Sequence, residues 1–148
     1  MRVCRYRTEP TMRLAAIAVL IGFTGSLHVV AAQAADSQTA PKDNKGFVAK
    51  VLQSVDLGPE IGATGRELRM RTLTIEPGGY IGMHSHKDRP AVVYDLQGTD
   101  TVIAQDGSVK TLTPGQSSAA TKDTTHWHRN DGKEPVVLLA IDVFHSTK

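Results

Sequence analysis

Short apolar segments separated by turn residues are the feature that most restricts the fold of this chain. They recur through residues 47–143 at intervals of roughly 8 to 12 residues. None of them keeps a 3.6-residue apolar stripe over three helical turns, and residues 67–71 alternate polar and apolar side chains as a half-buried strand does. The pattern predicts an all-β sandwich or barrel.

Glycine, proline and aspartate mark the ends of the expected strands. We expect strands over residues 47–55, 67–75, 91–96, 101–104, 109–112, 117–120, 125–129 and 136–143. Asp106-Gly107 is a tight-turn pair, so the two strands that flank it are expected to form a hairpin. Further turns are expected at 56–59, 76–79 and 113–115.

The first 34 residues have the order of a secretory signal peptide. Four arginines come first, an apolar run follows over 14–30, and small residues end the segment. Ala32 and Ala34 fit an A-x-A cleavage site, which predicts a cut after Ala34. Met12 is an alternative start to Met1, because Met12-Arg13 also supplies a basic lead.

A membrane anchor is the alternative interpretation of this leader. It is disfavoured because polar and small residues at 22–28 interrupt the apolar run, which falls short of the roughly 20 apolar residues that a span needs. We therefore expect a periplasmic or secreted protein with no stable membrane anchor after cleavage.

Removal of the leader changes the composition of the chain. The leader holds four of the 17 Lys and Arg residues and one of the 15 Asp and Glu residues, which leaves a formal net charge of −1. Such a charge gives no reason to expect nucleic-acid binding. The single cysteine, Cys4, also leaves, so no disulfide is expected. Residues 35–45 are expected to be a linker, and residues 46–148 a single domain.

Two His-x-His pairs are the strongest indication of chemistry. They are His84-Ser85-His86 and His126-Trp127-His128. Alternate residues of a strand point to the same face, so each pair can direct two imidazoles to one point, while Trp127 should point the other way into the core. Neutral imidazole suits Zn, Cu, Fe or Ni better than Mg or Ca. Two inward-facing pairs could therefore supply three or four nitrogens to one metal ion.

In these spacings the sequence resembles the cupin superfamily. Its first motif, G-x5-H-x-H-x3-4-E-x6-G, matches the spacing of Gly78, the first His pair, position 91 and Gly98. Its second motif, G-x5-P-x-G-x2-H-x3-N, matches the spacing from Gly115 to His126 and Asn130, with Thr121 and Asp123 in place of Pro and Gly. The resemblance covers about residues 67–143. It implies a jelly-roll β-barrel that holds one divalent metal on His84, His86 and His126.

The first motif departs from the family at Ala91, where the metal-binding glutamate would stand. Three neutral histidines would leave a more positive and more open metal site than the usual one with three histidines and one glutamate. His128 could supply the missing ligand or line the pocket instead. Tyr94 and Arg89 are further candidates for the pocket, since an arginine there could pair with a carboxylate. The metal itself (Fe, Mn, Zn, Ni or Cu) stays open.

Three functions are consistent with these features. The first is a metal-dependent enzyme that resembles the dioxygenases with three-histidine sites and acts on a small anionic or aromatic substrate. The second is a non-catalytic binding protein for a small molecule or a metal in the periplasm. The third is a cupin that has lost its metal together with its glutamate. A small-molecule ligand is the expected partner, and a homodimer is a further expectation.

Overall fold

The computed structural model describes residues 39–145. The predicted signal peptide, residues 1–34, lies outside the described residues, as do residues 35–38 of the predicted linker. The described residues contain eight strands and one short helix. Their bounds are β1 (Lys45–Asp56), α1 (Leu57–Ile61), β2 (Arg66–Ser85), β3 (Ala91–Gln97), β4 (Asp100–Ala104), β5 (Val109–Leu112), β6 (Ser117–Ala120), β7 (Thr125–Arg129) and β8 (Val136–His145). The all-β prediction is confirmed.

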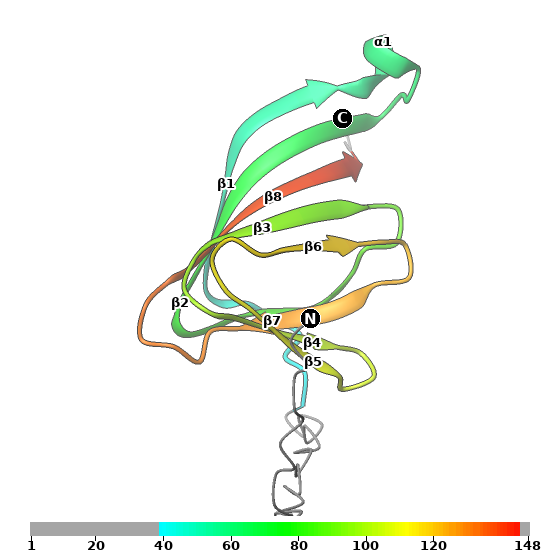
Figure 1. Cartoon of the computed structure of the whole chain (residues 1–148). Helices are drawn as coiled ribbons and strands as arrows, with labels where there is room; N and C mark the ends of the chain where they lie inside the picture. Colours follow the sequence, from blue (N-terminus) through cyan, green and yellow to red (C-terminus); the bar gives the residue numbers. More distant parts are fainter. Residues whose placement is uncertain (1–38, 146–148) are drawn as a thin grey trace, which may run out of the picture. The chain divides into compact units, whose positions relative to one another are not determined.

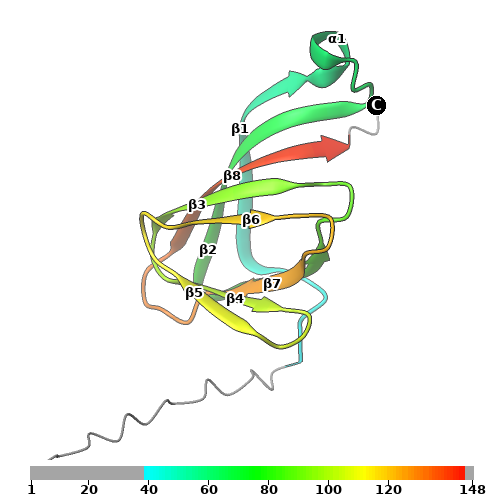
Figure 2. The same cartoon turned by 45° about the vertical axis from the view of Figure 1, so that its right-hand side comes forward.

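The strands form one strongly curved, nearly closed antiparallel sheet. Its order is β5-β4-β7-β2-β8-β3-β6, and β1 pairs with the remaining edge of β2. Figures 1 and 2 show β5, β4 and β7 lying across from β3 and β6, with β2 and β8 leading from one layer to the other. The predicted hairpin around Asp106-Gly107 is present, since Ile103 pairs with Val109.

One predicted turn lies within a strand instead of between two strands. Residues 76–79 were expected to separate two strands, but they bend a single strand, β2, which pairs with β8 through Ile75 and with β7 from Tyr80. Gly78 has a φ of 70°, which is accessible to glycine at little cost. A side chain on Gly79 would come within 2.8 Å of backbone oxygens of Lys45 and Glu76. The two glycines therefore let β2 change partners without ending.

The break expected at residues 56–59 contains the short helix α1. Asp56 caps it by accepting a hydrogen bond from the backbone N–H of Gly58 at 2.9 Å, and Gly62 ends it in the left-handed conformation. At five residues, α1 is too short to span a bilayer, and no helix within residues 39–145 is long and apolar enough to cross a membrane.

The core lies between the two layers. It is built from alternate residues of β2 and β8, with Phe47 and Val93 packed against them. Its buried members are Leu73, Ile75, Ile81, Val136, Leu138 and Ala140. Burial of this apolar set is the main force that holds the layers together in the absence of disulfides. Leu73, Ile81, Leu138 and Ala140 of this core also line a cavity.

The last residues of the predicted linker are attached to the barrel. The backbone N–H of Met83 donates to the carbonyl of Pro41 at 2.7 Å, and the N–H of Gly82 donates to the side chain of Asn44 at 2.9 Å. A side chain on Gly82 would lie 2.4 Å from the carbonyl oxygen of Asp43. This close approach brings residues 41–44 to the rim of the cavity.

Candidate metal centre and cavity

The two His-x-His pairs lie on neighbouring strands. His84 is near the end of β2, and His126 is its direct partner on β7. The N–H of His86 continues the pairing by donating to the carbonyl of Thr124 at 2.9 Å. His128 follows His126 by one strand period and faces the same side, whereas Trp127 between them is buried in the opposite direction. Antiparallel pairing thus gathers four imidazoles from two distant motifs.

The four imidazole rings cluster around His126. Its ring centroid lies 4.7 Å from that of His84, 5.0 Å from that of His86 and 4.6 Å from that of His128. One ring nitrogen from each of His84, His126 and His128 lies within 4.8 Å of the other two. The Nε2 atoms of His86 and His126 are 3.1 Å apart. The three predicted ligands therefore lie in one cluster, but the group of nitrogens close enough to share a metal ion contains His128 in place of His86.

Hydrogen bonds set the tautomers of three of these rings. Nδ1 of His84 lies 2.9 Å from the carbonyl of Gly82, and Nδ1 of His86 lies 3.0 Å from that of Arg89. Nδ1 of His128 lies 2.8 Å from Oδ2 of Asp100. The oxygen in each of these contacts accepts from Nδ1, so in the neutral rings of His84 and His86 it is Nε2 that carries the lone pair. Metal-binding histidines are usually oriented in this way.

Burial favours the neutral form of three of the clustered imidazoles. It lowers the pKa of His84 to about 4, with a smaller lowering from the neighbouring histidines. The same cause lowers the pKa of His126 and of His86. Neutral imidazole is the form that binds metal. His84, His86 and His126 are therefore in their metal-binding form at neutral pH.

The histidines line a cavity of about 290 Å³. Arg89, one of the candidate pocket residues, and Ala91 also line it, and Ala91 faces inward at the position of the missing glutamate. Tyr94 does not line it. Tyr94 is 45% exposed. Ala91, Val93 and Asp95 take the inward-facing positions of β3, so Tyr94 faces outward. The structure therefore does not bring Tyr94 to the site.

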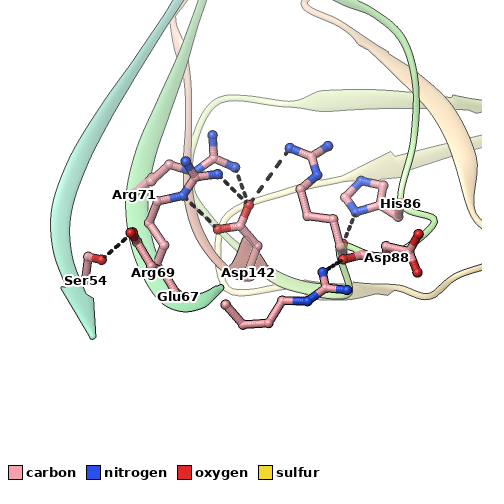
Figure 3. A network of polar contacts seen from close by, with 9 residues as sticks. Ser54, Glu67, Arg69, Arg71, His86, Asp88 and Asp142 are labelled. Atoms are coloured by element: carbon pink, nitrogen blue, oxygen red, sulfur yellow. Dashed lines mark hydrogen bonds and ion pairs between the residues drawn. The ribbon is translucent and has the colours of Figure 1, made fainter. Parts of the chain in front are cut away.

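A charged network lies against the same cavity (Figure 3). Asp142 on β8 is buried and accepts two hydrogen bonds from Arg69, at 3.1 and 3.0 Å, and one from Arg71 at 2.8 Å. Nη1 of Arg89 is 3.9 Å from the same carboxylate. Arg71 and Arg89 line the cavity, so two guanidinium groups share it with the histidines.

Sequence reasoning missed Asp100, Arg71 and Asp142. Asp142 interrupts an otherwise apolar strand, and a charge at an inward position was the available signal. Arg71 and Asp100 gave none, because their partners are distant in the chain. Asn130, the last residue of the second motif, is also buried, and its amide donates to the carbonyls of Ile75 and Glu134, each at 2.8 Å.

Comparison with known proteins agrees with this geometry. Residues 71–142 match the Cupin_2 family, described as a cupin domain. This part of the chain matches a cupin domain and includes both His-x-His pairs. No curated relative matched the sequence.

Solved structures similar to the cupin domain show the same fold. An uncharacterised protein with a double-stranded β-helix domain from Klebsiella pneumoniae is 17% identical, with a TM-score of 0.56 over 70% of this chain and 82% of that one. A predicted oxalate decarboxylase from Thermotoga maritima is 15% identical, with a TM-score of 0.55 over 71% and 93%. The polyketide cyclase RemF from Streptomyces resistomycificus is 15% identical, with a TM-score of 0.57 over 74% and 73%.

A buried carboxylate beside the site has a consequence for stability. Asp95 is 1% exposed, and neither of its carboxylate oxygens has a hydrogen-bond partner within the described residues. Burial raises the pKa of Asp95 to about 6, and the charge of Asp100 adds to the effect. The folded state therefore binds a proton here more tightly than the unfolded state. This favourable contribution is complete below about pH 4 and is lost as the pH rises toward 6.

We expect Asp95→Asn to stabilise the protein at pH 7. The gain should be about 1 to 3 kcal/mol and should largely disappear at pH 4, where Asp95 is already neutral in the folded state. Urea unfolding of chelator-treated protein at both pH values measures it, and the exposed Asp123→Asn variant is the control. An equal effect at the two pH values would contradict the assignment.

Proposed function

We propose that this chain is an exported metalloprotein whose cupin domain binds a divalent transition metal and uses it to oxygenate a small anionic or aromatic molecule. The observation that carries the proposal is the cluster of four imidazoles at one cavity, three of them with Nδ1 held by acceptors. A neutral nitrogen donor set suits Fe, Zn, Ni or Cu better than Mg or Ca.

His84 and His126 would hold the metal in either of two ligand sets. The third nitrogen would come from His86, as the family resemblance implies, or from His128, as the close grouping of nitrogens favours. When bound, the metal would act as a Lewis acid or support oxygen chemistry. Ala91 leaves space where the family has a carboxylate, so a ligand of the cavity could approach the metal.

The similar structures support an enzyme only at the level of fold. They include a predicted oxalate decarboxylase and a polyketide cyclase, which shows that this architecture carries catalytic sites. Fold alone does not define a reaction, so the choice of oxygenation rests on the nitrogen-only ligand set and on the resemblance to three-histidine sites.

A binding protein without turnover is the second candidate. One observation favours it: the residues found to line the cavity within 39–145 include no carboxylate, phenol or thiol. Three of the four histidines are committed to the metal in this proposal. The fourth histidine and Lys42 are then the side chains of this lining that could move protons. Ligand binding without reaction would follow naturally from such a lining.

Metal content and oxygen consumption test these alternatives. The full chain should be expressed with its leader, recovered from the exported fraction, and analysed by intact mass and by elemental analysis. We expect a mass that begins at Ala35 and one transition metal per chain. Oxygen uptake with a panel of small carboxylates and phenols would support the oxygenase. Saturable binding without uptake would support the binding protein, and the absence of metal from chains refolded with each candidate ion would refute both.

A further inference from the structure

We propose that Arg71 and Arg89 form a carboxylate-binding subsite in the cavity, so that its ligand is a small carboxylate with an apolar body. This inference deepens the proposed function and rests on the same cavity. It concerns the end of the ligand that does not reach the histidines, and it can therefore be tested apart from the metal.

The charges around Asp142 do not balance. Three guanidinium groups, those of Arg69, Arg71 and Arg89, surround this single buried carboxylate, which leaves a formal excess of two positive charges. Arg69 uses two nitrogens on Asp142 and stacks over the ring of Phe144, with 3.7 Å between its Cζ and the ring centroid. The excess charge therefore resides on the two arginines that line the cavity.

Both of these arginines keep donors that Asp142 does not use. Arg71 bonds Asp142 through Nη2 alone, and its Nε is buried with no hydrogen-bond partner among the described residues. The distance of 3.9 Å from Arg89 to Asp142 is too long for a hydrogen bond. Burial lowers the pKa of Arg71, and the neighbouring Arg69 and Arg89 lower it further, as expected for a crowded cation. An anion in the cavity would relieve this charge.

A carboxylate is the anion that this arrangement suits. The planar guanidinium presents parallel N–H groups that match the two oxygens of a carboxylate. Asp142 anchors the arginines from the protein side and leaves their remaining donors for a ligand. Lys42 at the rim of the cavity adds a third positive charge that attracts an anion.

The rest of the lining indicates the body of the ligand. A volume of about 290 Å³ lies at the lower end of the range for ligand pockets, which favours a small molecule. The lining is mainly apolar, with Phe47, Leu73, Ile81, Val93 and Leu138 among its members. Asn44 and Ser118 are the uncharged side chains there that offer an amide or a hydroxyl. A sugar would need more such groups, whereas an aromatic or branched carboxylate would not.

Benzoate and benzamide are suitable probes because they share size and shape but differ in charge. We expect calorimetric titration of the chelator-treated full chain to show benzoate binding that is at least roughly tenfold tighter than benzamide binding. Arg71→Met should weaken benzoate binding by roughly 10- to 100-fold. Lys122→Met removes the same charge from an exposed surface pair and should change it less than twofold.

Several outcomes would overturn the subsite. They are equal affinity for the two probes, unchanged benzoate affinity in Arg71→Met, and no benzoate binding to the wild-type chain. If Arg71→Met does not fold, as judged by circular dichroism, Arg89→Met replaces it, because Arg89 does not hydrogen-bond Asp142. Arg89→Met should then weaken benzoate binding, and an unchanged affinity would refute the proposal.

The metal is measured separately in the same preparations. Wild type that binds benzoate through Arg71 but takes up no Zn²⁺ or Co²⁺ would leave the subsite standing and refute the proposed metalloprotein. A chain that takes up metal normally, with benzoate affinity unaffected by either arginine, would refute the subsite and leave the metal centre standing.

Discussion

His126→Ala is expected to lower the affinity for Zn²⁺ or Co²⁺ by more than roughly 100-fold. His126 lies at the centre of the cluster, and it belongs to either set of three ligands. Loss of a group that only orients a ligand costs about 10- to 100-fold in metal affinity, so loss of the ligand itself should cost more. Calorimetric titration of chelator-treated protein measures the change. His145→Ala, at an exposed histidine at the end of β8, is the matched control.

Three further variants identify the third ligand in the same titration. If His128 binds the metal, His128→Ala should weaken binding as strongly as His126→Ala does, and Asp100→Asn should weaken it by about 10- to 100-fold, because Asp100 orients His128. If His86 is the ligand, His86→Ala should have the large effect instead. Unchanged affinity in all of these variants would exclude the histidine cluster as the metal site.

Local patterns were sufficient to predict most of the strands. The two-residue period, the turn pair at Asp106-Gly107 and the stops at glycine and proline depend on residues close in sequence. The same period placed His84 beside His86 and His126 beside His128 on a common face. The bend in β2 was not predictable in this way, because it depends on β8 and β7 each pairing with a different half of that strand.

The alternation of inward and outward side chains along β3 also indicates where Tyr94 points. The family motif places position 91 inside the barrel, so residue 93 must face inward and residue 94 outward. Tyr94 was therefore excluded by the rule that located the histidines. Tyr94 was one of several candidate pocket residues, and it lies exposed on β3, outside the lining of the cavity.

The charged half of the site depends on contacts between distant residues. Arg69 and Arg71 precede Asp142 by 73 and 71 residues, and Asp100 precedes His128 by 28. No local pattern pairs them, and each is unremarkable alone. Only the register of β2 against β8, in which Arg69 pairs with Asp142, brings the carboxylate to the arginines.

Asp142→Asn is expected to lower the free energy of unfolding by about 3 kcal/mol, the lower end of the range for removing one partner of a buried ion pair. The lower end applies because Arg69 and Arg71 keep some exposure to water, with 13% and 15% of their side chains accessible. For a domain of this size, such a loss should lower the melting temperature by roughly 10 to 20 °C. Thermal unfolding measures it.

Asp123→Asn is the matched control, because its ion pair with Lys122 is exposed and should contribute little to stability.

The Asp142→Asn variant also connects the charge network to the cavity. Without Asp142, the three arginines have no compensating carboxylate, so millimolar benzoate should restore part of the lost melting temperature by binding the folded state. Benzamide should not do so, because it brings no charge. If Asp142→Asn were no less stable than Asp123→Asn, hydration alone would be enough to stabilise the charges of the arginines. Asp142 would then not be the group that holds them at the cavity.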